Sequence, residues 1–203
     1  MSASRHHRAA FSLVELLIAV AVVATLSAVL IGLAEPSLHD QLRGAAEGIA
    51  AELGLAQSLA IANNSSYALE FDKSASQVVL RHVGANPTLD AVPRNPFGRP
   101  DAPADQRITN LGDLPRLGAA VRIASVQTAD QPPHEVDRIE FGPLGEMTGT
   151  TETAVWLVSG TGSRRRYVTV RVQPVTGLVA VGPLVATPPP VTHLASLRTS
   201  PGP

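Results

Sequence analysis

The polarity of the chain changes in a regular way along its length. Residues 1–10 are small or basic, whereas residues 11–35 are apolar almost throughout, and their only charged residues are Glu15 within the run and Glu35 at its end. Nineteen consecutive residues, from Leu16 to Ala34, carry no charge. As a helix with a rise of about 1.5 Å per residue, this run would be roughly 28 Å long, which matches a hydrocarbon core of about 30 Å. The pattern therefore predicts a membrane-spanning helix.

An amphipathic helix is expected directly after this segment. Apolar residues recur at spacings of three and four from Leu38 to Ala60, which is the period of one buried helix face. We therefore expect residues 36–63 to form the second half of a long N-terminal helix. Pro36 is expected to mark a kink between the two halves, because proline removes a helical hydrogen bond.

Beyond residue 63 the period of the apolar residues becomes two, which is typical of half-buried strands. Residues 64–182 are therefore expected to form a β-rich head. Strands are predicted over residues 66–72, 76–83, 120–128, 136–141, 153–158, 167–173 and 178–181. One long helix packed on an antiparallel sheet follows from these elements, which is an α+β fold.

Two segments of the head lack any apolar period. Residues 84–105 contain five prolines and are expected to form a surface loop. Residues 183–203 are rich in proline, threonine and serine and are expected to be a flexible tail.

Composition narrows the classes of function. The chain has 203 residues, of which 44% are hydrophobic, so one domain with an appendage is expected. A formal net charge of -1 argues against a general binder of polyanions. The absence of cysteine excludes disulfides, thiolate catalysis and cysteine-based metal sites.

No motif in the sequence indicates catalysis or metal binding. His134-Glu135 lacks the second histidine that a zinc-protease helix requires. The glycines of residues 159–163 lack the lysine of a phosphate-binding loop, and no G-x-S-x-G elbow is present. We therefore expect no enzymatic activity, no cofactor and no metal.

Glu15 separates the possible interpretations of the apolar segment. A secretory signal peptide has a shorter apolar region of about 7–15 residues, whereas a plain signal anchor fits the length and the basic Arg5 and Arg8. Neither accounts for a carboxylate inside the apolar run, where it costs about 2.5–3.5 kcal/mol at a helix centre. Cleavage between Ala10 and Phe11 would create an amine within reach of Glu15 in the same or a neighbouring chain. The alternative is that Glu15 lies at headgroup depth.

Residues 10–15 (AFSLVE) with the apolar run after them resemble the class III prepilin signal of type IV pilins and type II secretion pseudopilins. The resemblance implies that a prepilin peptidase cleaves between Ala10 and Phe11 and N-methylates Phe11. It also implies that Glu15 neutralises the N-terminal amine of an adjacent subunit during assembly. This chain has Ala10 where the family usually has glycine.

Later segments are similar to one group of that family. Residues 53–63 (LGLAQSLAIAN), 139–145 (IEFGPLG), 167–170 (YVTV) and 176–179 (TGLV) look like the minor pseudopilin H group, which includes FimT-like minor pilins. The resemblance implies a pilin-like head in which half of the helix is buried against a β-sheet, and no enzymatic activity.

The implied function is that of a minor pseudopilin, a structural subunit of a type II secretion pseudopilus. Its partners would be other pseudopilins or pilins through the N-terminal helix, prepilin peptidase and an inner-membrane assembly platform. The chain would cross the inner membrane once, with a cytoplasmic N-terminus and a periplasmic head, before it enters a periplasmic filament. The alternatives are a FimT-like minor type IV pilin in pilus assembly or DNA uptake, and a membrane-tethered binding domain.

Arg164, Arg165 and Arg166 form a candidate contact for nucleic-acid phosphates. In a chain with a net charge of -1, three adjacent arginines are a weak electrostatic footprint. A solvated loop before a strand is the simpler explanation, so we do not expect nucleic acid to be a partner.

Overall fold

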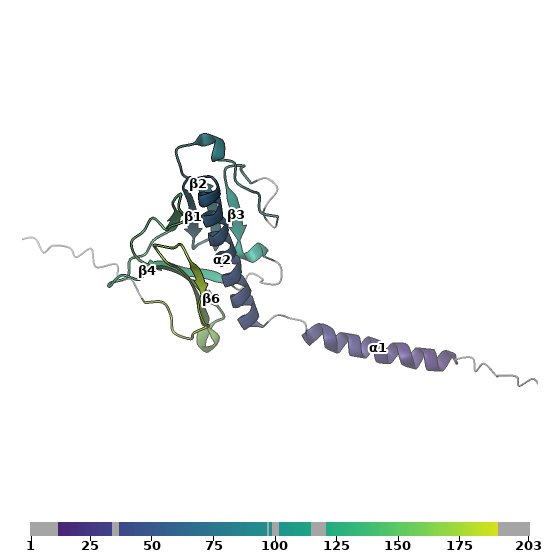
Figure 1. Cartoon of the computed structure of the whole chain (residues 1–203). Helices are drawn as coiled ribbons and strands as arrows, with labels where there is room; N and C mark the ends of the chain where they lie inside the picture. The colour runs from purple at the N-terminus through teal and green to yellow at the C-terminus, as the bar shows by residue number, and fades with distance from the viewer. Residues whose placement is uncertain (1–11, 34–36, 97, 99–101, 115–120, 191–203) are drawn as a thin grey trace, which may run out of the picture. The chain divides into compact units, whose positions relative to one another are not determined.

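The computed structural model describes residues 12–33, 37–96, 98, 102–114 and 121–190. The chain divides into two compact units, residues 1–36 and residues 37–203. The first contains helix α1 (Leu13–Leu33), and the second contains helix α2 (Leu38–Ala62) and all of the strands (Figure 1). Ala10, Phe11 and the expected kink at Pro36 lie outside the described residues.

Helix α1 presents apolar side chains on every side along its described length. The large ones, from Leu13 to Leu26, are each more than half exposed. The hydroxyls of Thr25 and Ser27 donate to backbone carbonyls three or four residues earlier, so the helix satisfies its own polar groups. Among the described residues, which exclude the side chains of residues 28–33, no helix is long and apolar enough to cross a membrane. The membrane span expected over residues 11–35 stays a prediction.

Helix α2 confirms the expected amphipathic helix. Ser37 caps its first turn, because the Ser37 Oγ accepts a hydrogen bond from the Asp40 N–H at 3.2 Å. The apolar residues at helical spacing form its buried face: Leu42, Ala45, Ala46, Ile49, Leu53, Ala56 and Ala60. The four alanines are small enough for the strands to pack close to the helix backbone.

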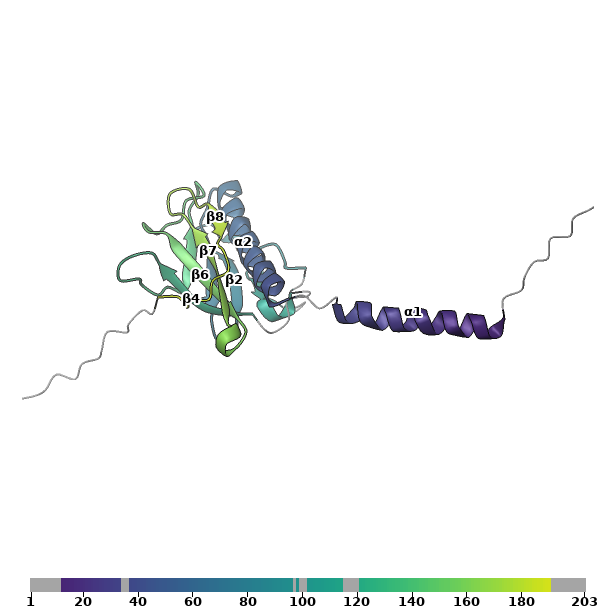
Figure 2. The same ribbon diagram turned by 90° about the horizontal axis from the view of Figure 1, so that it is seen from below.

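The head contains two four-stranded antiparallel sheets, and α2 contacts strands of both (Figure 2). The first sheet has the order β3-β2-β1-β5 and consists of β1 (Tyr67–Asp72), β2 (Gln77–His82), β3 (Arg107–Asn110) and β5 (Arg138–Phe141). The second has the order β4-β6-β7-β8 and consists of β4 (Arg122–Thr128), β6 (Thr153–Ser159), β7 (Arg166–Val172) and β8 (Val179–Val181). One hydrophobic core joins α2 to both sheets.

Two features differ from the sequence-based expectation. The strands form two sheets where one was expected, because β4 pairs with β6 and β5 pairs with β1. Alternation along a strand shows which side chains are buried, but it does not select the pairing partner. Strand β3 was not expected either, since its four residues (RITN) contain three polar side chains.

The expectation of a flexible tail from residue 183 is wrong for residues 183–190. Val185 pairs with Tyr167 of β7 through two backbone hydrogen bonds of 2.8 Å. The Gln127 side chain donates to the Pro190 carbonyl at 3.0 Å. Residues 191–203 lie outside the described part of the chain. The first eight residues of the expected tail therefore belong to the head.

Candidate functional site

Glu15 lies in the first turn of α1, and its N–H donates to the Ser12 Oγ at 3.2 Å. The partial positive charge at a helix N-terminus favours a carboxylate at this position. No ion pair joins Glu15 to any described residue. Its neighbours Leu13, Val14 and Leu16 are 75%, 64% and 61% exposed. Glu15 is therefore a carboxylate without a charged partner among the described residues, at the start of an exposed apolar helix.

The surface of α1 is itself a candidate interaction site. A helix that is apolar on all sides is normally buried in lipid or among other helices. Each Å² of apolar surface that leaves water contributes about 25 cal/mol. The exposed side chains of α1 therefore favour a second apolar surface as their environment.

The three arginines proposed from the sequence come together in the connection from β6 to β7. Arg164 ends a short 3-10 turn (Gly162–Arg164), and Arg166 is the first residue of β7. The Arg166 guanidinium donates to the carbonyls of Ser163 and Arg165 at 3.0 and 2.8 Å. All three side chains are exposed, and none forms an ion pair with a described residue.

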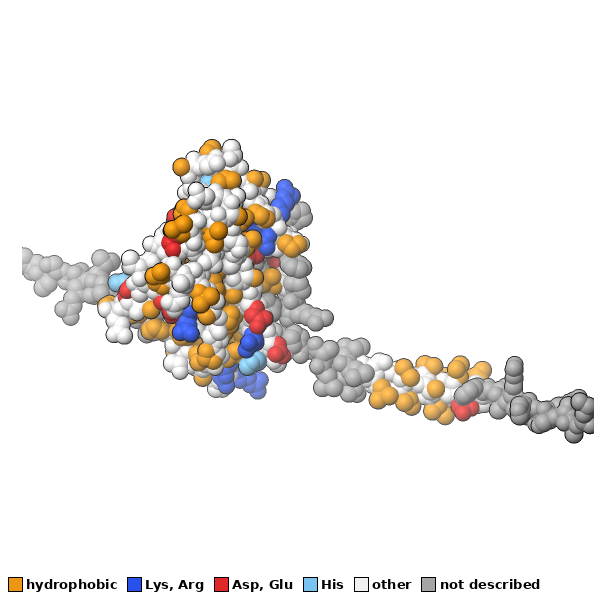
Figure 3. Space-filling view, viewed as in Figure 1, with side chains coloured by type: hydrophobic (Ala, Val, Ile, Leu, Met, Phe, Trp, Pro, Cys, Tyr) orange, Lys and Arg blue, Asp and Glu red, His pale blue; other side chains and the backbone are white. Residues whose placement is uncertain are grey.

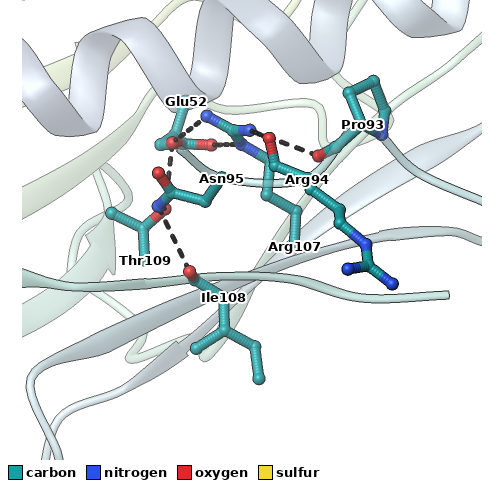
Figure 4. Close-up of polar contacts among 7 residues, drawn as sticks. All are labelled: Glu52, Pro93, Arg94, Asn95, Arg107, Ile108 and Thr109. Carbon is teal, nitrogen blue, oxygen red and sulfur yellow. Dashed lines mark hydrogen bonds and ion pairs between the residues drawn. The ribbon is translucent and has the colours of Figure 1, made fainter. Parts of the chain in front are cut away.

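Sequence reasoning missed a buried ion pair between α2 and β3 (Figure 4). The Arg107 Nε and Nη2 donate to the Glu52 carboxylate at 2.8 and 3.0 Å, and the Thr109 hydroxyl donates to Glu52 Oε1 at 2.9 Å. The Glu52 and Arg107 side chains are only 10% and 13% exposed. The available signal was the position of Glu52 beside Leu53 on the apolar face of the helix.

The same arginine holds the proline-rich loop. Its Nη1 donates to the carbonyls of Pro93 and Arg94 at 3.2 and 2.7 Å. The Asn95 side chain donates to the Ile108 carbonyl and to the Thr109 hydroxyl at 3.2 and 2.7 Å. The expected surface loop over residues 84–105 is thus attached to β3 and, through Arg107, to α2.

A second cluster, in which Ser65 and His82 are buried and Asp90 is exposed, has the order of groups found in serine hydrolases. Ser65 Oγ lies 2.7 Å from His82 Nε2, and His82 Nδ1 lies 2.8 Å from Asp90 Oδ1. Sequence reasoning missed it, because the three residues come from the turn after α2, from β2 and from the loop. None of them belongs to a recognisable motif.

The geometry around Ser65 does not suit nucleophilic attack. Ser65 and His82 are each 9% exposed, and a Cβ added at Gly84 would lie 2.0 Å from Ser65 Oγ. In nucleophilic attack, a substrate carbonyl would have to approach the Ser65 hydroxyl to within about 3 Å. The Gly84 backbone covers the hydroxyl at this position. The cluster connects three segments of the head and has no room for a substrate. Among the described residues, no group of three or more histidines and acidic residues could hold a metal ion.

Comparison with known proteins gives two family matches. Residues 5–31 match the prokaryotic N-terminal methylation motif. Residues 45–176, which are more than half of the chain, match the type II transport protein GspH family. No curated protein matches the chain significantly.

Among solved structures, the chain is similar to the type IV minor pilin FimU of Pseudomonas aeruginosa in two crystal forms. The sequence identity is 16% in both, with TM-scores of 0.44 and 0.43. The similarity covers 70% of this chain and 88% and 93% of the two FimU chains.

Proposed function

The chain belongs to the type II transport protein GspH family, and from this membership we propose that it is a minor pseudopilin of a type II secretion pseudopilus. The observation that carries the proposal is the combination of an N-terminal methylation motif with an exposed apolar helix whose first turn holds one carboxylate, Glu15, that forms no ion pair with a described residue. The α+β head fits a structural subunit, and the closed Ser65 cluster supports a role without catalysis.

Processing would occur between Ala10 and Phe11, both of which lie within the matched motif. A prepilin peptidase would remove residues 1–10 and N-methylate Phe11. The new amine would be four residues from Glu15, which is about one helical turn. An amine and a carboxylate placed in apolar surroundings stabilise each other strongly. Glu15 would therefore select the N-terminus of an adjacent subunit during assembly.

Before assembly, residues 11–35 would cross the inner membrane once. The positive charges of Arg5 and Arg8 favour a cytoplasmic N-terminus. The head, from residue 37 onward, would then lie in the periplasm. The large apolar side chains of the described part of α1 support this arrangement, because lipid would cover the side chains that are exposed in the isolated chain.

Assembly would move α1 from lipid into a bundle of the same helices from other pseudopilins or pilins. Apolar side chains gain little from leaving lipid for other helices. The pairing of Glu15 with the amine of a neighbouring subunit would therefore set the axial register between the helices. Extraction of the subunit from the membrane would require an inner-membrane assembly platform. Prepilin peptidase would process the chain before this extraction. A minor type IV pilin would use the same N-terminal chemistry, and the filament with which the chain co-purifies distinguishes the two.

The test is N-terminal sequencing and intact-mass measurement of the full chain, expressed with and without prepilin peptidase. We expect loss of residues 1–10 and an N-methylated Phe11 only when the peptidase is present. The Ala10→Gly variant carries the usual residue of the family and serves as the positive control. An intact leader in both strains, with processing of the control alone or of neither, would overturn the proposal.

A further inference from the structure

A shallow groove lies where α2 begins in the head, with a volume of about 490 Å³. We call it the arginine groove, and it is lined by Leu38, His39, Arg164, Arg166, Leu184 and Ala186. These residues come from the start of α2, from the turn before β7 and the first residue of β7, and from the segment after β8. Basic side chains gather beside a histidine and apolar side chains at the lower end of the head (Figure 3).

The rim of the groove carries arginine side chains that form no ion pair with a described acid. Arg164 and Arg166 line it, Arg165 lies between them, and the side chains of all three are exposed. The only side-chain hydrogen bonds of these arginines to described residues are those of Arg166 to two carbonyls of its own turn. Guanidinium groups bind phosphate oxygens in a two-point geometry. The rim therefore suits a phosphate group.

The floor of the groove is apolar. Leu38 is 38% exposed, Leu184 is half-buried, and Ala186 is exposed beside them. A ligand that combines a phosphate with hydrocarbon would satisfy both parts. A nucleic-acid duplex offers phosphates without hydrocarbon and requires a longer basic stripe than three residues.

Chain connectivity favours the same class of ligand. Helix α2 begins at Leu38, and four residues separate it from the end of α1 at Leu33. Four residues of linker extend over at most about 14 Å. If α1 crosses the membrane, the start of α2 must therefore remain close to the headgroup layer.

We propose that the arginine groove binds the phosphate of an anionic phospholipid at the periplasmic surface of the inner membrane, a proposal that rests on the proposed membrane insertion of α1. Arg164 and Arg166 hold the phosphate oxygens, and the apolar floor takes the glycerol and the first methylene groups. The contact holds the head against the bilayer before assembly. It is lost when the subunit leaves the membrane.

The absence of cysteine allows a site-specific test on the full chain. Ser163→Cys places an environment-sensitive fluorophore in the turn that carries the arginines, and the Ser163 carbonyl still accepts from Arg166. The control is the variant Leu144→Cys. Leu144 is 86% exposed, and its neighbour Gly145 lies beside Ile61, at the opposite end of α2 from the groove. Both chains are reconstituted into phosphatidylcholine vesicles with and without phosphatidylglycerol.

We expect a blue shift of the Ser163 fluorophore only in vesicles that contain phosphatidylglycerol, and no shift of the Leu144 fluorophore. Each basic residue near an anionic membrane strengthens the contact about fivefold. Replacement of Arg164, Arg165 and Arg166 together by glutamine should weaken it by roughly two orders of magnitude. In the labelled chain that keeps all three arginines, high salt should reduce the blue shift, because salt screens exposed charges.

Flotation of the vesicles in alkaline carbonate reports insertion of α1 separately. A chain that floats and shows the same fluorescence in both lipid mixtures overturns the groove proposal and leaves the proposed function intact. A chain that does not float overturns both. A short DNA duplex is added to the phosphatidylcholine vesicles as a further arm. If the duplex shifts the emission of the fluorophore at position 163 and phosphatidylglycerol does not, the groove is a nucleic-acid contact and the lipid proposal is wrong.

Discussion

Glu52 on α2 accepts two hydrogen bonds from the guanidinium of Arg107 on β3, 55 residues later in the chain. Both side chains are close to nine-tenths buried. Each side chain supplies hydrogen-bond partners to the other, and Thr109 and two loop carbonyls complete their hydrogen bonds. Helix α2, strand β3 at the edge of the first sheet and the proline-rich loop are therefore joined at one point.

Glu52→Gln should destabilise the head strongly. The substitution keeps the shape of the side chain and leaves Arg107 as a buried charge without its counter-ion, which costs about 3–5 kcal/mol. Glu47→Gln is the matched control, because its ion pair with Arg43 is about 60% exposed on both sides. It should cost less than about 1 kcal/mol. Urea denaturation measures both, and equal losses would contradict the assignment of Glu52.

Gly177→Ala should destabilise the head more than Gly162→Ala does. Both glycines have positive φ angles, of 63° and 55°, so each substitution carries about 1–2 kcal/mol of backbone strain. A Cβ at Gly177 would also lie 2.1 Å from the Gly145 carbonyl oxygen, whereas a Cβ at Gly162 meets nothing within 4 Å. The difference between the two melting temperatures isolates the steric clash. A difference of zero would show that Gly145 moves freely.

Ser65→Ala should reduce stability without loss of any hydrolase activity. His82 Nε2 would lose its buried partner, at a cost of about 1–3 kcal/mol. Ser58→Ala is the control, since this exposed serine bonds to the Gly54 carbonyl within its own helix. A serine-directed fluorophosphonate should not label Ser65 in the wild-type chain. Labelling that disappears in Ser65→Ala would show that the cluster is reactive.

The turn between β1 and β2 should be sensitive to acid through Asp72. The Ser74 hydroxyl and then the Ala75 N–H donate to this carboxylate and hold its pKa below the ordinary value of 3.8. Because the folded-state pKa is lowered, the stabilisation is present above 3.8 and is lost as the pH falls through the lower folded value. Asp72→Ala should therefore destabilise the chain near neutral pH and make little difference in strong acid. The measurement is the free energy of unfolding of both chains as a function of pH. A difference between variant and wild type that stays constant with pH would contradict the prediction.

Glu15→Leu should abolish incorporation into filaments and leave membrane insertion and the head unchanged. The substitution removes the proposed partner of the Phe11 amine and keeps α1 apolar. Ser12→Ala is the control, because it removes the Ser12 hydroxyl bond to the Glu15 N–H and keeps the carboxylate. Shearing of filaments followed by quantification of the subunit in the sheared fraction provides the measurement. Normal incorporation of Glu15→Leu would show that another group supplies the register.

Local periodicity was sufficient to predict the secondary structure of most of the head. The spacing of Leu42, Ile49 and Leu53 predicted α2, and alternation predicted seven of the eight strands in the described part of the head. It did not predict β3, which is short and mostly polar. It also did not predict that the strands form two sheets, because pairing depends on contacts between segments distant in sequence.

The polar clusters were harder to predict for the same reason. Glu52 and Arg107 meet across 55 residues, and Ser65, His82 and Asp90 come from three separate elements. Each residue looks ordinary in its own segment. By contrast, the Glu15 motif is local, so the sequence alone was enough to propose its role.

The attachment of α2 along its length has a mechanical consequence. Its apolar face is buried from Leu42 to Ala60, Glu52 is bonded to β3, and the Gln57 side chain donates to the carbonyls of Gly145 and Thr176 at 2.8 and 2.9 Å. Tension applied at Leu38 would act on these side-by-side contacts in shear, so that they share the load. A head anchored in this way can be pulled through its own helix without unravelling from that end.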